Sequence, residues 1–470
     1  MSNTSLASGL KQRHVTMLSI AGVIGAGLFV FSGHAIAKAG PAALLAYIFT
    51  GALVVLVMRM LGEMAVASPD TGSFSTYADR AIGRWAGFSI GWLYWWFWVL
   101  AIPLEAIAAA NILNAWIPQV DTWVFASTVI LLLTCSNFFG VARYGEFEFW
   151  FGLLKIIAII AFIALCAAAL LGLLPDREVS GLEQLVSQHG GFAPNGLEAI
   201  VGAMLTTMFS FIGAEVVTIA AAESKNPAQQ ITRATNSVVW RICVFYLLSI
   251  LMILSIVPWN DPRLPEVGSF QRALEIMQIP NAKLLMDIVV LVAVASCMNS
   301  QVYTGSRMLY SLAQRGDAPR FLKRISMAKV PLAAVASTTV LGVLATFVNY
   351  FAPQSVFAFL LATSGAVALL VYLVIAVSQL CLRKKLLAAG EPLHFRMWLF
   401  PWLTWAVILF ISGALIGMFF IPAYRSEITA TGLLAVVIIC LGLMNSKRAS
   451  HLAVRHPEQR APLPETVSNT

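Results

Sequence analysis

Charged side chains are scarce in this sequence of 470 residues, where Asp, Glu, Lys and Arg together make up 11% and hydrophobic residues make up 59%. The mean hydropathy of +0.82 lies far above that of a soluble domain. The sequence also lacks a P-loop, a nucleophile–base constellation and any metal-ligand spacing among its histidines. We therefore expect neither an enzyme nor a metal or cofactor site, and ion gradients rather than ATP should drive any uphill work.

Cysteines are few and isolated: the six in the sequence fall one to a hydrophobic block, without CxxC spacing. We interpret them as small buried hydrophobic residues and not as a disulfide framework or a metal site. The net charge of +8 could suggest a nucleic-acid partner. In a membrane protein, however, cationic cytoplasmic loops explain such a charge better, so we expect no nucleic acid to bind.

Long hydrophobic runs dominate what remains, and most reach the roughly 20 residues that a helix needs to cross about 30 Å of hydrocarbon. We predict an all-α integral membrane protein with twelve transmembrane helices. The predicted spans are 16–37, 41–67, 84–113, 121–140, 149–173, 197–222, 236–257, 281–312, 331–350, 354–382, 397–421 and 427–445.

The basic residues predict the orientation. Of 30 lysines and arginines, 23 fall on the face that holds the N-terminus in this arrangement. This bias predicts that both termini are cytoplasmic. Lys155 lies within a predicted helix, and the remaining six fall on the opposite face. These six are Lys38, Arg177, Arg263, Arg272, Lys283 and Arg425.

Two connections, 174–196 and 258–280, are long and fall on the predicted outer side. The second alternates apolar and polar residues at helical spacing from Val267 to Met277, and such an amphipathic segment could cover an outer vestibule. After Asn445 the chain becomes polar and contains proline, so we expect a disordered cytoplasmic tail over 446–470.

The first hydrophobic run contains the segment SIAGVIGAG from Ser19 to Gly27, with three glycines and no charge. Glycine costs about 1 kcal/mol in a helix interior and supplies freedom of φ and an exposed backbone. One interpretation is a packing face made of small residues. The other is a broken transmembrane helix, whose freed amides would point at an anion as half-helix N-termini do in secondary transporters.

The sixth predicted helix repeats this feature, with Gly213 and Glu215 near its middle. A carboxylate at that depth costs at least about 2.5 kcal/mol, so Glu215 should face a cavity or a partner. Gly-interrupted helices in corresponding positions of two halves indicate a binding site near the membrane midplane, between inverted repeats.

Two further charged residues lie inside predicted helices. Lys155 is only about six residues into its hydrophobic run, and spacing alone does not decide between snorkelling and an inward amine. Glu105 follows Pro103 and the aromatic run Tyr94–Trp98, most of which we interpret as an interfacial belt. Two acids and a lysine at depth suit a zwitterionic substrate and proton coupling.

The predicted cytoplasmic face carries two more motifs. Arg59 and Glu63 are spaced four residues apart and predict an ion pair, followed by a turn and short helix. The segment Ser306–Pro319 extends the eighth predicted helix, and we interpret it as a solvated helix end.

Five segments resemble amino acid permeases of the amino acid–polyamine–organocation superfamily. They are GVIGAGLF, EMAVASPDTGSFSTYA, GEFEFWFGLLK, FSFIGAEVVTIAAAES and SRMLYSLAQRGDAP. The resemblance extends from about Leu10 to Asn445 and is greatest to the bacterial 4-aminobutyrate (GABA) permeases. It implies the leucine-transporter fold, with broken helices 1 and 6. The implied organisation is a cytoplasmic segment 1–15, a first five-helix repeat 16–173, an outer loop 174–196, a second inverted repeat 197–382, helices 11 and 12 over 397–445, and the tail 446–470.

The resemblance also implies roles for individual residues. Amides around Gly25 would bind the substrate carboxylate, with Ala26 standing where relatives often have a serine. Phe209 would cover the pocket. Lys155 and Glu215 would serve in proton coupling, with Ser296 and Asn299 as neighbours of Lys155. The full substrate-binding set is Gly22, Ile24, Gly25, Ala26, Gly27, Glu105, Phe209, Ser210 and Gly213.

The function that this resemblance implies is proton-coupled import of an amino acid zwitterion across the bacterial inner membrane, with GABA as the expected substrate. A permease for proline, an aromatic or another amino acid remains an alternative, as does a sensor that binds amino acids without transporting them. The expected partners are the substrate and the lipid bilayer. The oligomeric state cannot be derived from the sequence.

Overall fold

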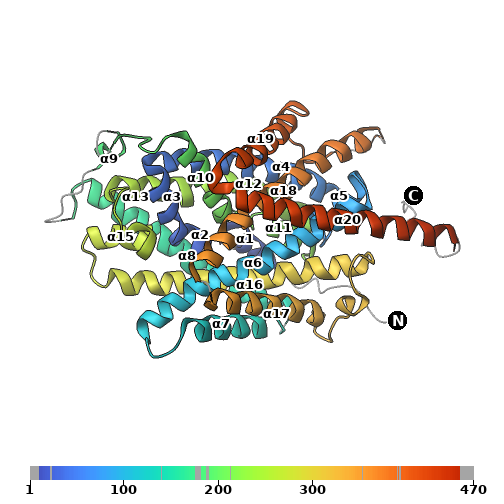
Figure 1. Ribbon diagram of the computed structural model, residues 1–470, viewed down its shortest axis with the longest axis horizontal. Coiled ribbons are helices and arrows are strands. Elements are labelled where there is room, and N and C mark those ends of the chain that lie inside the picture. The colour runs from blue at the N-terminus through green and yellow to red at the C-terminus, as the bar shows by residue number, and fades with distance from the viewer. Residues whose placement is uncertain are drawn as a thin grey trace.

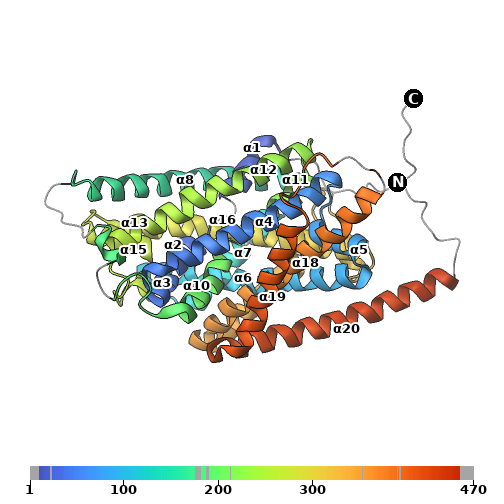
Figure 2. The same cartoon turned by 90° about the horizontal axis from the view of Figure 1, so that it is seen from above.

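The computed structural model describes residues 10–21, 24–138, 140–174, 181–186, 190–211, 213–351, 353–388, 390 and 393–455. These residues form an elongated bundle in which the long helices run along the long axis (Figure 1). In Figure 1 the segments α9 and α15 lie at one end of the bundle and α5 lies at the other, and Figure 2 shows α15 and α5 at the same two ends. We call these the α15 end and the α5 end.

The bounds of the α-helices are as follows. They are α1 Gln12–Ala21, α2 Ala26–Phe29, α3 Phe31–Ala39, α4 Ala43–Ala67, α5 Ser73–Ala81, α6 Arg84–Trp116, α7 Thr122–Asn137, α8 Val141–Leu170, α9 Glu183–Val186, α10 Gly196–Phe211, α11 Val216–Ala222, α12 Pro227–Arg241, α13 Ser249–Ile256, α14 Leu264–Val267, α15 Ser269–Ile276, α16 Ala282–Gln314, α17 Leu332–Phe351, α18 Pro353–Ala388, α19 Trp402–Phe420 and α20 Arg425–Arg455. The π-helix η2, Ile242–Leu248, joins α12 to α13, and short 3₁₀ turns lie at Gly40–Ala42, Arg320–Lys323 and Pro422–Tyr424.

Nine helical segments of the described chain are long and apolar enough to cross a membrane, by length and composition. One of them, Ala26–Ala67, contains most of the first predicted span and all of the second. Two shorter apolar helices, Thr122–Asn137 and Leu332–Val348, coincide with the fourth and ninth. All twelve predicted spans therefore have a helical counterpart, and the all-α class is confirmed.

Several helices extend past their predicted bounds, because polar turns continue a helix beyond the hydrophobic run that reveals it. The helix α8 begins at Val141 and α12 begins at Pro227, each several residues before the predicted span. The predicted disorder after Asn445 is wrong for the first part of the tail, since α20 continues to Arg455. Residues 456–470 lie outside the described residues.

The two predicted breaks are present. The first span is divided into α1 and α2, with Gly25 in extended conformation at the start of α2. The sixth is divided into α10 and α11, and Gly213 between them has a φ of +102°, which glycine adopts at little cost. The segment α10 packs against α2 and α3, while α1 packs against α11, so the two broken helices lie side by side.

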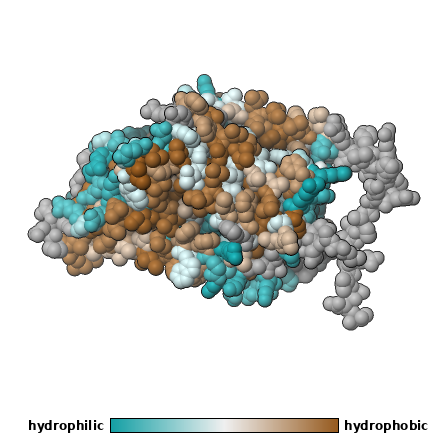
Figure 3. All heavy atoms as spheres, turned by 90° about the horizontal axis from the view of Figure 1, so that it is seen from below, coloured by the Kyte–Doolittle hydropathy of each residue, from teal (hydrophilic) through white to brown (hydrophobic). Residues whose placement is uncertain are grey.

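Apolar side chains cover the outside of the bundle. On α8, the exposed residues Phe147, Trp150, Leu154 and Ile157 follow one another at spacings of three or four, which places them on one helix face. Hydrophobic residues dominate the middle of the face seen in Figure 3, and hydrophilic residues gather toward the ends. This pattern is typical of a surface that faces lipid. Three of the six free cysteines, Cys135, Cys243 and Cys440, are also exposed, contrary to our interpretation of them as buried.

The aromatic run on α6 is not an interfacial belt. Tyr94, Trp95, Phe97 and Trp98 are buried, and the Trp95 Nε1 donates a hydrogen bond to the Thr338 hydroxyl at 3.0 Å. The prediction failed because α6 is surrounded by other helices, including α5, α7 and α16, so its aromatic residues pack inside the bundle.

The predicted ion pair between Arg59 and Glu63 is also wrong. The Arg59 guanidinium donates to the Asn236 side chain at 2.9 Å and lies over the Phe395 ring. The buried Glu63 carboxylate instead accepts from the Arg383 guanidinium at 3.0 Å. Partners from α12, from α18 and from the segment that follows α18 thus replace the local helical pair. The predicted turn and short helix after this motif are present as α5.

The last turns of α16 are buried from Ser306 to Ala313, contrary to our interpretation, and exposure begins at its final residue, Gln314. The side chain of Arg307 is 2% exposed and pairs with the equally buried Glu223, at 3.2 Å between Arg307 Nε and Glu223 Oε1. This pair joins α16 to the residue that follows α11, near the α5 end. A buried arginine needs such a partner, because an unpaired charge in a helix bundle is costly.

The Glu63 contacts generate a stability prediction. Its carboxylate accepts from Arg383, from the Gln379 amide at 2.8 Å and from the Met397 main-chain amide at 2.5 Å. Replacing Glu63 with alanine leaves the largely buried Arg383 guanidinium without its carboxylate partner and should lower the free energy of unfolding in detergent by about 3–5 kcal/mol. The exposed Glu198 provides the control. An E63A variant as stable as an E198A variant would contradict this assignment.

Candidate functional site

The break between α1 and α2 exposes main-chain groups in the middle of the bundle. Gly25 has φ −129° and ψ −151°, and helical structure resumes at Ala26. The freed Ala26 amide donates a hydrogen bond to the buried Glu105 carboxylate of α6, at 3.0 Å between Ala26 N and Glu105 Oε2. A carboxylate thus sits at the N-terminal end of a half-helix, where freed amides favour an anion.

The packing around this break requires glycine. A Cβ atom added to Gly25 would lie 2.6 Å from Glu105 Oε1 and 2.8 Å from the Cβ of Cys297 on α16. One added to Gly27 would lie 2.8 Å from the Ser210 Cα on α10. Three helices therefore approach the exposed backbone at van der Waals distance, which only the absence of a side chain permits.

Lys155 of α8 contacts the same break. Its side chain is fully buried, and Nζ donates to the Ile24 carbonyl oxygen at 2.9 Å and to the Ser296 hydroxyl at 2.9 Å. The amine is thus turned inward and does not snorkel to the membrane surface. One main-chain carbonyl of the break is satisfied by a cationic side chain from a helix outside it.

Glu148 is a buried acid that the sequence analysis did not single out. Its carboxylate accepts from Ser296 at 2.7 Å and from the Asn299 amide at 2.8 Å. Asn299 is therefore connected to Lys155 through Glu148 and Ser296. Glu148 and Lys155 are seven residues apart on α8, a spacing that places both on one helix face and could have revealed the pair.

The second break is built around Glu215, the residue that precedes α11. Its carboxylate accepts from the Gly213 main-chain amide at 3.2 Å and from the Tyr94 hydroxyl of α6 at 2.9 Å. It is 1% exposed, so it faces the interior of the bundle and not lipid. As at the first break, a carboxylate satisfies an amide that the interrupted helix leaves free.

The two breaks are joined directly. The Ser210 hydroxyl of α10 donates to the Gly27 carbonyl oxygen at 2.7 Å, and the Ser210 carbonyl accepts from the Tyr246 hydroxyl at 2.9 Å. Phe209 is buried beside them, with its ring 5.4 Å from that of Phe31 between centroids. A movement of either half-helix must therefore disturb the other.

A small cavity lies against these groups. It has room for about one water molecule. The cavity is bounded by α2, α6, α10 and α16. Its lining residues are Gly27, Phe97, Trp98, Glu105, Phe209, Cys297 and Gln301.

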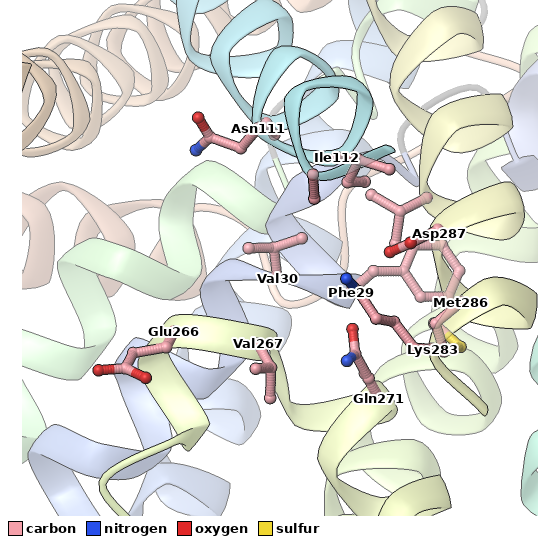
Figure 4. A pocket seen from close by; sticks show the side chains of 13 residues that line it. Phe29, Val30, Asn111, Ile112, Glu266, Val267, Gln271, Lys283, Met286 and Asp287 are labelled. Atoms are coloured by element: carbon pink, nitrogen blue, oxygen red, sulfur yellow. The ribbon is translucent and has the colours of Figure 1, made fainter. Parts of the chain in front are cut away.

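An open vestibule lies on the α15 side of this cavity and is lined by three of the same four helices, through Phe29 of α2, Asn111 of α6 and Asp287 of α16. As predicted, the amphipathic segment that forms α14 and α15 borders it. Figure 4 shows the Lys283 and Gln271 side chains reaching toward its centre. The vestibule and the cavity therefore lie one after the other along α2, α6 and α16.

Most predicted site residues come together at this point. Ile24, Gly25, Ala26 and Gly27 form the first break, Phe209, Ser210, Gly213 and Glu215 form or border the second, and Glu105, Lys155 and Ser296 contact them. Gly22 lies outside the described residues. A buried anion and a buried cation at freed main-chain groups are suited to binding a molecule that carries both charges.

Comparison with known proteins identifies the family. A model of the family described as "Amino acid permease" matches residues 14–448. The chain belongs to this family. It is 71% identical to a probable GABA permease of Pseudomonas aeruginosa, over 96% of this chain and 95% of the relative.

Two further relatives show how the family diverges. This permease is 61% identical to the gamma-aminobutyric acid permease of Escherichia coli, over 93% of both chains. It is 39% identical to an aromatic amino acid transport protein of Corynebacterium glutamicum, over 94% of this chain and 96% of the relative. Relatives named for different substrates therefore match over nearly the full chain.

Among solved structures, a mutant of the manganese transporter of Eremococcus coleocola matches the permease with a TM-score of 0.57. The match covers 94% of each chain at 15% sequence identity, so the fold is shared even though few residues are. The leucine-transporter fold that the sequence implied, with its inverted repeats and two additional helices, is thereby confirmed.

The crowding at Gly25 generates a prediction. In a Gly25→Val permease, the added side chain must displace Glu105 and Cys297, so uptake should fall by more than about tenfold. Gly417 on α19 provides a matched control, because a Cβ atom there meets nothing within 4 Å. A G417V variant should transport as the wild type does in the same vesicle assay. Uptake retained by G25V would exclude the first break from the binding site.

Proposed function

We propose that this permease imports GABA together with protons across the bacterial inner membrane. The α15 end is the outer end in this proposal, and both termini are cytoplasmic. The choice of GABA is supported by the two relatives at 71% and 61% identity, both of which are named for that substrate. The orientation is supported by the excess of lysine and arginine in the connections at the α5 end.

One observation carries the assignment of the binding site: the Ala26 amide already holds a carboxylate, that of Glu105, at 3.0 Å. An amide that satisfies a carboxylate from its own chain can satisfy that of a substrate with the same geometry. The substrate carboxylate would take the place of Glu105, with Gly25 leaving the backbone open to approach. Because the cavity holds only about one water molecule, binding requires this exchange and a movement of Phe209.

The same exchange supplies a partner for the substrate amine. Once Glu105 leaves the Ala26 amide, its negative charge attracts the ω-ammonium group in a site of low dielectric. The C-terminal end of α10, which contributes Phe209 to the cavity wall, favours a cation through the helix dipole. GABA thereby bridges two helix breaks whose ends have opposite polarity.

Proton coupling is assigned to Lys155 and Glu215. Lys155 binds the Ile24 carbonyl of the first break, and Glu215 binds the Gly213 amide of the second. A change in the charge of either group alters how firmly a half-helix is held to its neighbours. A proton that binds one conformation more strongly than the other then shifts the equilibrium between outward- and inward-open states.

The decisive experiment is uptake of radiolabelled GABA by proteoliposomes that contain the purified permease. Uptake should exceed equilibrium when the outside is acidic and should be inhibited by unlabelled GABA more strongly than by proline, aromatic or basic amino acids. Stronger inhibition by one of these competitors would reassign the substrate. Binding of GABA without uptake would instead indicate an amino acid sensor.

Lys155 generates a further prediction. A Lys155→Ala permease loses the bonds to Ile24 and Ser296 and should not accumulate GABA above equilibrium when a pH gradient is applied. The exposed Lys323, in the 3₁₀ turn after α16, is a matched control, and K323A should accumulate GABA normally. Uphill uptake by K155A would remove Lys155 from the coupling mechanism.

Glu148 generates another prediction, because its carboxylate accepts a hydrogen bond at 2.7 Å from Ser296, a direct partner of Lys155. Glu148→Gln preserves the shape of the side chain and removes its negative charge. We expect exchange of labelled for unlabelled GABA to continue, while the acceleration of net uptake by a pH gradient falls severalfold. An unchanged response to the gradient would show that the charge on Glu148 does not contribute to coupling.

A further inference from the structure

Gln301 of α16 has a buried acceptor without a partner. The side chain is 1% exposed, and within the described residues its Oε1 accepts no hydrogen bond. Its Nε2 donates to the Cys297 Sγ at 3.4 Å. Gln301 lines the cavity that Gly27 and Glu105 also line, so the unpartnered oxygen belongs to the candidate binding site.

Such an oxygen is unusual in a folded protein. The large majority of buried polar side-chain atoms have a hydrogen-bond partner, and leaving one unsatisfied costs about 1–3 kcal/mol. A ligand that brings a donor to this place recovers that cost. The neighbouring side chains of Phe97 and Trp98 add aromatic rings to the same wall, and aromatic faces attract cations. The chemistry of this end of the cavity therefore suits an ammonium group.

The position of Gln301 along α16 sets the distance between its acceptor oxygen and the first break. Cys297 lies against the first break, since its Cβ would be 2.8 Å from a Cβ on Gly25. Gln301 comes four residues later, which is about one helical turn, or roughly 6 Å along the axis. In an extended four-carbon ω-amino acid the nitrogen and the carboxyl carbon are about 5 Å apart, from bond lengths of about 1.5 Å. In an α-amino acid they are only about 2.5 Å apart.

We propose that Gln301 Oε1 accepts a hydrogen bond from the ω-ammonium group and thereby sets the chain length that the permease prefers. This proposal rests on the proposed function, in which the carboxylate binds at the Ala26 amide. An ammonium group has three N–H donors. Glu105 supplies the compensating charge for one of them, and Gln301 supplies a directed acceptor one helical turn from the carboxylate site.

The test compares the wild type with Gln301→Leu, Gln301→Glu and Gln301→Asn. Inhibition of labelled GABA uptake is measured with 3-aminopropanoate, 4-aminobutanoate and 5-aminopentanoate. Q301L removes the acceptor at similar volume and should raise the KM for GABA about 10–100-fold, as expected for loss of a hydrogen bond to a charged group. Q301E retains an acceptor, and its KM should stay within about threefold of the wild-type value.

Q301N tests the preference for substrate length, which a purely structural role of Gln301 would not change. Its acceptor is withdrawn by one methylene group, so preference should shift from 4-aminobutanoate toward 5-aminopentanoate by at least about fivefold. Thr304→Val, on the same helix, is the control, because the Thr304 hydroxyl donates to the Ser300 carbonyl of its own helix at 2.7 Å. T304V should retain the wild-type order of preference.

The outcomes separate the two proposals. A wild-type permease that does not take up GABA refutes the proposed function. Wild-type uptake combined with an unchanged KM in Q301L, or with an unchanged length preference in Q301N, refutes the role of Gln301 and leaves the proposed function intact. Should Q301L fail to fold, as judged by size-exclusion chromatography, the Q301N preference decides alone.

Discussion

Main-chain groups left free by an interrupted helix must be satisfied inside the membrane, and this constraint shapes the centre of the permease. The Ala26 amide is satisfied by Glu105, the Ile24 carbonyl by Lys155 and the Gly213 amide by Glu215. Each partner side chain is charged or can be, and two of the three come from helices outside the breaks. The structure therefore places ionisable groups at the two helix breaks, because the main-chain groups freed there need strong hydrogen-bond partners.

In the proposed mechanism, these hydrogen bonds couple substrate binding to a change of conformation. A substrate carboxylate that takes the Ala26 amide must change the contacts of Glu105, and α6, which carries Glu105, also carries Tyr94, the hydroxyl partner of Glu215. The second link is the Ser210 bond to Gly27 between the two broken helices. In the proposed mechanism, substrate and proton thus act on the same few hydrogen bonds. A ligand with different affinity for the two states of these bonds shifts their equilibrium.

The sequence was sufficient for the features that depend on local chemistry. Glycine at positions 25 and 213, inside otherwise apolar runs, predicted both breaks, and the runs themselves predicted the spans. What it could not provide is the choice of partner in three dimensions. Arg59 and Glu63 have ideal helical spacing, yet each finds a better partner on a distant segment. Glu148 was overlooked because its hydrogen-bond partners, on α16, lie about 150 residues away.

The central claim is that the freed Ala26 amide binds the substrate carboxylate in exchange for Glu105, and a cryo-EM structure of the permease in lipid nanodiscs with saturating GABA tests it most directly. The account predicts density for a carboxylate within about 3.2 Å of Ala26 N, the range of an N–H···O bond. It also predicts that the Glu105 side chain has turned away from that amide. A structure in which Glu105 still accepts from Ala26, while GABA is bound elsewhere, would contradict the account.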